Sequence, residues 1–114
     1  MTKSLTNINV LDFSHALSGP FCSMLLAELG AKIIKIEPPH GDHFRPANGG
    51  ATFAVVNRNK RSLCLDLKQP SASIIMERLI SKCDVIVENF NPGTMKRLGY
   101  HYEALKKMKP DIIY

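Results

Sequence analysis

The side chains that could bind an anionic ligand lie in short segments beside apolar runs. These segments are the turn Ser18–Pro20, the basic cluster Arg58–Arg61, and the amide loop Asn89–Asn91. A turn that opens a helix offers free N–H groups and the positive end of the helix dipole, which suit a phosphate or carboxylate. Arginine binds phosphate through two hydrogen bonds, whereas lysine acts as a point charge. Amides beside an aromatic ring suit a thioester arm or an adenine ring.

Each segment also has a purely structural interpretation. Ser18 stands where a helix N-cap would, the basic cluster could be a solvated face, and Asn89–Asn91 could be a turn closed by the following Pro-Gly pair. His15 titrates near neutral pH and is a candidate base by its position. Asp12 and Asp66 adjoin apolar runs, and we expect them to cap or pair rather than to react.

Strands that alternate with helices must position these residues. Near-continuous apolar strands separated by helical patterns are typical of a parallel sheet with helices on both faces, a Rossmann-like α/β arrangement. The expected strands are Ile8–Phe13, Lys32–Glu37, Ser62–Leu67, Asp84–Glu88 and the start of a fifth at Asp111–Tyr114. The expected helices are Gly19–Gly30, Pro70–Ile80, Thr94–Leu98 and Tyr102–Met108, with a loop over His40–Gly50.

This topology predicts where a ligand would bind. Ligands of parallel α/β sheets lie beyond the carboxyl ends of the strands, so the loops after Phe13, Glu37, Leu67 and Glu88 are expected to share one rim. A dinucleotide is not favoured. Glu37 follows Gly19 at close to the spacing of a ribose-binding carboxylate, but the first turn has one glycine where that motif needs three.

Composition narrows the function classes. The 114 residues carry a net charge of +5, and 45% of them are hydrophobic, which fits one globular domain. No apolar run approaches the ~20 residues that cross a bilayer, and the amino terminus lacks a secretory h-region, so we expect a cytoplasmic protein without a membrane partner. The cysteines, Cys22, Cys64 and Cys83, form no Cys-x-x-Cys pair, which argues against a disulfide framework or a metal site. No nucleic-acid signature accompanies the positive charge.

Three motifs resemble the amino-terminal end of the family III CoA-transferases of the CaiB/BaiF type: Leu11–Pro20, Val55–Lys68 and Val85–Gly93. That superfamily includes formyl-CoA and carnitine CoA-transferases and the 2-methylacyl-CoA racemases. The resemblance implies that residues 1–114 are the amino-terminal part of a Rossmann-like domain, incomplete at its carboxyl end. It also implies coenzyme A, bound as an acyl-CoA substrate without a metal, a carboxylate acceptor, and a homodimer. By resemblance the CoA contacts are Leu17, Ser18, Leu65, Lys68, Asn89, Phe90, Asn91 and Arg97.

The resemblance also concerns catalysis. In family III transferases the nucleophile is an aspartate that forms an aspartyl intermediate, and it lies beyond the segment matched here, so no catalytic residue is expected in residues 1–114. A racemase, or a noncatalytic nucleotide-binding or interaction module, remains an alternative. Many relatives carry an arginine after the second-strand glutamate, whereas this sequence has Pro38 and Pro39, so an adenine contact is not implied there.

Overall fold

The structure, a computed structural model, describes residues 2–114 and is built on a four-stranded parallel sheet. The strands are β1 (Asn9–Asp12), β2 (Lys32–Glu37), β3 (Lys60–Cys64) and β4 (Val85–Val87), and they lie in the order β3-β2-β1-β4. Leu11 at the centre of β1 pairs with Ile34 of β2 and Ile86 of β4. Ile113 forms a parallel bridge to Val85, which confirms that a fifth strand begins beside β4.

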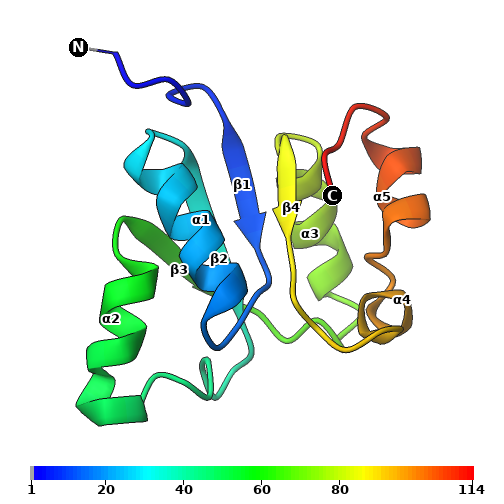
Figure 1. Ribbon diagram of the computed structural model, residues 1–114. Helices are drawn as coiled ribbons and strands as arrows, with labels where there is room; N and C mark the ends of the chain where they lie inside the picture. The colour runs from blue at the N-terminus through cyan, green and yellow to red at the C-terminus, as the bar shows by residue number, and fades with distance from the viewer. Residues whose placement is uncertain (1) are drawn as a thin grey trace.

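Helices cover both faces of the sheet, as the alternating pattern predicted (Figure 1). Val10 and Leu11 are neighbours in β1 but belong to different cores, because successive side chains of a strand point to opposite faces. The core around Val10 includes Ala27 of α1, and the core around Leu11 includes Met76 of α3 and Leu105 of α5. The helices are α1 (Ser18–Glu28), α2 (Ala51–Asn57), α3 (Ala72–Ile80), α4 (Thr94–Leu98) and α5 (Tyr102–Met108), with a short 3-10 segment η1 (Ala47–Gly50).

The ends of α1 match the sequence prediction only in part. Gly30 has a φ of 106°, as expected of a glycine that ends a helix. The prediction that Ser18 is the N-cap is wrong: the helix begins at Ser18 itself, and Leu17 precedes it without a side-chain cap. The Ser18 hydroxyl instead lies 3.4 Å from the side-chain nitrogen of Asn89. Ser18 therefore contributes to a contact between loops rather than to capping.

Two elements differ most from the sequence prediction, while β1, β4 and α3 are one or two residues shorter at their ends. Helix α2 was not predicted, because it follows a Gly-Gly pair and buries only Val56 among its residues. Strand β3 begins at Lys60, two residues before the predicted start, ends at Cys64 instead of Leu67, and pairs Lys60 with Ile33 of β2. Charged residues can occupy this strand because it lies at the edge of the four-stranded sheet. None of the helices in residues 2–114 has the length and apolar character needed to cross a bilayer.

Candidate ligand-binding cleft

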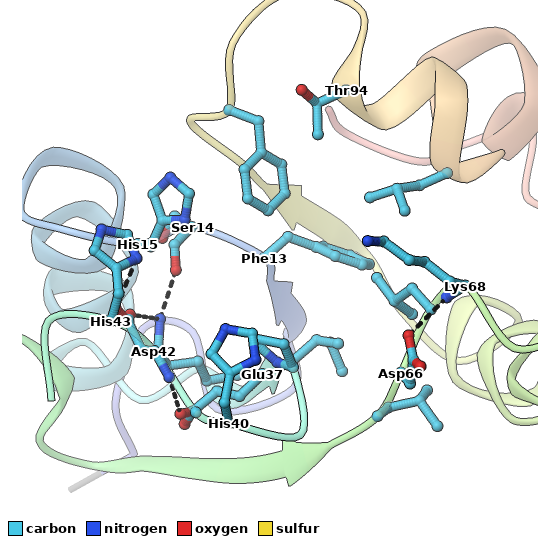
Figure 2. A pocket seen from close by; sticks show the side chains of 18 residues that line it. Phe13, Ser14, His15, Glu37, His40, Asp42, His43, Asp66, Lys68 and Thr94 are labelled. Atoms are coloured by element: carbon cyan, nitrogen blue, oxygen red, sulfur yellow. Dashed lines mark hydrogen bonds and ion pairs between the residues drawn. The ribbon is translucent and has the colours of Figure 1, made fainter.

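A cleft of about 370 Å³ lies at the carboxyl ends of the four strands (Figure 2). Its lining comes from the loops that follow all of them: Phe13–His15 after β1, Pro38 and residues 40–43 after β2, Leu65–Lys68 after β3, and Phe90 after β4. Residues 35–37 at the end of β2, with Thr94 and Leu98 of α4, complete it. The prediction that these loops share one rim is confirmed. Parallel strands bring it about because all of their carboxyl ends point the same way.

A row of rings forms one wall of the cleft. The His15 ring lies 4.8 Å from that of Phe90 and 4.9 Å from that of His43, and both contacts are edge-on. Burial lowers the pKa of His15, and the neighbouring His43 and Lys35 lower it further, while Asp42 opposes them. Burial and the neighbouring cations therefore favour the uncharged form of the His15 imidazole, in which one ring nitrogen can accept a proton.

Asn89 joins the loop after β4 to the loop after β1. Its side-chain oxygen accepts a hydrogen bond from the His15 N–H at 2.9 Å, and its side-chain nitrogen donates to the His15 carbonyl at 2.8 Å. These two bonds use half of the four hydrogen bonds that the amide can make. Asn89 thus fixes the backbone that carries His15, whereas a contact between Asn89 and a ligand stays a prediction.

Lys68 is the cation on the opposite wall. Its backbone N–H donates to Asp66 at 3.0 Å, and Figure 2 shows its side chain extending into the cleft. Among residues 2–114, the Lys68 ammonium has no acidic partner within ion-pair distance. A cation without a protein partner, at the edge of an apolar cleft, suits an anionic ligand.

The other residues predicted to contact a ligand are divided among three places. Leu65 and Phe90 line the cleft, as Lys68 does. Arg97 lies on the exposed side of α4 and donates to the hydroxyl of Thr94, a lining residue, at 2.9 Å. Asn91 is exposed, and Leu17 and Ser18 lie in a separate shallow hollow with Ala16 and Phe21.

Comparison with known proteins identifies the family. Residues 5–114, nearly the whole chain, match the family model described as CoA-transferase family III. The chain belongs to CoA-transferase family III. It is 44% identical over 120 residues to the formyl-CoA:oxalate CoA-transferase of Bradyrhizobium diazoefficiens and 42% identical to that of Rhodopseudomonas palustris strain BisB18. Each alignment covers 99% of this chain and 28% of the relative.

Solved structures of similar sequence have the same fold. A CAIB/BAIF family protein from Brucella suis aligns with a TM-score of 0.94 at 32% identity, covering 100% of this chain and 33% of that one. Rv3272 from Mycobacterium tuberculosis aligns with a TM-score of 0.94 at 38% identity, and the alignment covers 98% of this chain and 32% of that one. The family and the α/β fold expected from the sequence are therefore confirmed. This family III chain spans about a third or less of the length of the relatives that it matches.

The basic cluster of this family III chain does not line the cleft. The Lys60 ammonium lies 2.9 Å from the Asp12 carboxylate, with the two side chains 2% and 0% exposed. Arg58 pairs with Glu28 of α1 at 2.7 Å on the surface. Burial lowers the pKa of Lys60, and Asp12 acts in the opposite direction. The cluster is thus not simply a solvated face, because Lys60 is an internal partner of Asp12.

Sequence reasoning did not single out three further charged residues beside the cleft, which are Lys35, Asp42 and Arg45. Lys35 and Asp42 form a buried ion pair with 3.0 Å between Nζ and Oδ2, and both line the cleft. Arg45 donates two hydrogen bonds of 2.7 Å to Glu37. One signal in the sequence was available. Lys35 lies two residues from both Ile33 and Glu37 in an apolar strand, so all three side chains are on the same face and the lysine points inward.

Proposed function

We propose that this chain forms one CoA-binding wall of an enzyme that transfers CoA between an acyl-CoA and a carboxylic acid. The observation that carries the proposal is the rim cleft, in which Lys68, without an acidic partner among residues 2–114, faces apolar side chains. The lining suits coenzyme A chemically, because Phe13, Leu65 and Phe90 can pack against the pantetheine arm or the adenine ring. Lys68 in the cleft and Arg97 beside it can bind the phosphates.

The reaction that we propose proceeds through an aspartyl intermediate, with the nucleophile outside the residues matched here. The aspartates near the cleft are consistent with a nucleophile elsewhere, because each of them is already engaged in contacts within the chain. Asp12 is buried in its ion pair with Lys60, and Asp42 is buried in its ion pair with Lys35. Asp66 accepts hydrogen bonds from the backbone of Lys68 and the side chain of Gln69. We therefore expect residues 1–114 alone to bind CoA without turning it over.

The binding proposal is tested by removing the two cations. Replacing Lys68 or Arg97 by alanine should weaken CoA binding by about 1–3 kcal/mol, the range for a lost hydrogen bond to a charged group. Isothermal titration calorimetry with CoA measures the effect. Lys82→Ala is the control, since Lys82 is an exposed lysine that does not line the cleft. Unchanged affinity in both test variants would contradict the proposal.

Formyl-CoA and oxalate are the first substrate pair to test, because the names of the relatives specify both. Formation of oxalyl-CoA by the intact enzyme, followed by chromatography, would support transfer. Exchange of the α-proton of a 2-methylacyl-CoA without transfer would favour the racemase alternative. We propose a homodimer as the working assembly and the cytoplasm as its location, which sedimentation and cell fractionation can check.

A further inference from the structure

A single buried lysine connects two of the loops that line the cleft. The Lys35 ammonium lies 3.0 Å from Asp42 Oδ2, and both side chains are 2% exposed. It also donates a hydrogen bond to the backbone carbonyl of Ser14. Asp42 belongs to the loop after β2, and Ser14 belongs to the loop after β1. One charged group therefore contacts both loops at the rim.

The loop after β2 is attached to the interior by charged contacts, of which one is the pair of hydrogen bonds from Arg45 to Glu37 and the other is Asp42. Among residues 38–46, all of which the structure describes, only Asp42 is buried. Its Oδ1 accepts the Phe44 N–H at 2.8 Å, and its own N–H donates to Glu37 at 3.0 Å. The loop is thus anchored by a carboxylate rather than by an apolar side chain. An anchor of this kind depends on its counter-ion, because an unpaired charge in the interior is strongly unfavourable.

The position of Asp42 determines where the His43 ring lies against the His15 ring. His43 directly follows Asp42, and its ring contacts the His15 ring at 4.9 Å between centroids. His15 directly follows Ser14, whose carbonyl accepts the Lys35 hydrogen bond. Lys35 therefore holds the residue before each of these two histidines. A shift of either loop would change the separation of the rings and the width of the cleft at that end.

We propose that the buried Lys35–Asp42 ion pair is a clamp that holds the His15 and His43 wall in the arrangement that receives a CoA thioester, so that Lys35 and Asp42 are positioning residues. The identity of the ligand rests on the proposed function, while the clamp itself rests on the contacts above. A buried ion pair often adds less stability than an apolar pair of the same volume. The pair accordingly acts by selecting one loop position.

The test compares the loss of this ion pair with the loss of another buried ion pair. Lys35→Met and Asp42→Asn each remove one charge of the clamp with little change in volume, and the double variant removes both. Lys60→Met is the matched control, because Lys60 is also 2% exposed and ion-paired but does not line the cleft. Asp12 keeps its hydrogen bonds from Ser14 and Ser23 in that control.

Three quantities are measured on the intact protein: CoA affinity by calorimetry, the melting temperature, and the contact between the His15 and His43 rings by NMR with labelled histidine. We expect Lys35→Met to weaken CoA binding by about tenfold or more and to abolish the ring contact. Asp42→Asn should do the same, and the double variant should bind no worse than the weaker single variant. Lys60→Met should lower the melting temperature while keeping affinity and ring contact.

Two results would overturn the clamp. One is a folded Lys35→Met or Asp42→Asn protein in which the ring contact and the affinity are both unchanged. The other is a Lys60→Met protein that loses both to the same extent, because general destabilisation would then explain the effect. If Lys35→Met does not fold, the affinity and ring contact of Asp42→Asn decide whether the clamp is overturned. If the unmodified protein binds no CoA, the proposed function fails, whereas the ring contact still tests the clamp.

Discussion

Asp12 and Lys60 form a buried ion pair between the end of β1 and the start of β3, with 2.9 Å between carboxylate and ammonium. The Lys60 ammonium also donates to the Pro20 carbonyl in the first turn of α1 at 2.8 Å. Asp12 accepts further hydrogen bonds from Ser14 and Ser23. A lysine from a basic cluster is thus part of the interior and joins two strands to a helix.

Removing Lys60 should destabilise the protein strongly. Lys60→Met leaves the Asp12 carboxylate buried without its counter-ion, which costs about 3–5 kcal/mol of unfolding free energy. Arg58→Met is the control, since the Arg58–Glu28 pair is on the surface and such pairs contribute about 0–1 kcal/mol. Urea denaturation measures both. Equal losses in the two variants would contradict the internal role of Lys60.

Glu37 should make stability depend on pH in the acid range. Burial raises its pKa, but hydrogen bonds from Arg45, from Ser62 and from the Asp42 N–H outweigh burial and lower the pKa from 4.5 to about 2. A carboxyl group with a lowered pKa in the folded state stabilises that state when it is ionised. Its contribution is therefore complete above pH 4.5 and is lost as the pH falls toward 2.

A Glu37→Gln variant isolates this contribution. The difference in unfolding free energy between the natural protein and the variant should be largest above pH 4.5 and should shrink as the pH approaches 2. Urea denaturation at a series of pH values measures the difference. A difference that stays constant over this range would show that the Glu37 carboxyl does not titrate as the geometry requires.

Asn89 should protect the backbone amide of His15 from hydrogen exchange. Asn89→Ala removes both hydrogen bonds to His15 and leaves a partly buried N–H and carbonyl unpaired, at a cost of about 1–3 kcal/mol. The His15 amide should then exchange its hydrogen faster, as measured by NMR. Asn91→Ala is the matched control, because Asn91 lies in the same loop with an exposed side chain. Unchanged exchange at His15 in Asn89→Ala would contradict this role.

Gly19 should not accept a larger side chain. A Cβ atom at position 19 would lie 2.3 Å from the Cβ atom of Ser14 and 2.7 Å from its hydroxyl oxygen, so α1 would have to move away from the β1 loop. Such overpacking typically costs about 1–3 kcal/mol. Gly19→Ala should lower the melting temperature, while Ser18→Ala, at an exposed position, should change it little. Similar melting temperatures for both variants would argue against a close approach at Gly19.

Local signals in the sequence determined most of the fold. The bounds of β2 were predicted correctly because a β-branched run ends at Pro38 and Pro39, which cannot continue a central strand. The short helices α4 and α5 also have their predicted bounds. The shared rim followed from the alternation of strands and helices, because a parallel sheet directs all of its carboxyl ends to one edge.

Only the tertiary structure decided how the charged residues are used. Lys60 looked like part of a ligand-binding or solvated cluster, but its partner Asp12 lies 48 positions away in the sequence. Lys35 and Asp42 drew no attention, because a charge can be buried only where its counter-ion meets it. Periodicity and turn residues act over a few neighbouring positions, whereas ion pairing in the interior depends on where whole strands are placed. The sequence therefore predicted the rim of the cleft, and the packing of β1, β2 and β3 determined which cations remain free to face it.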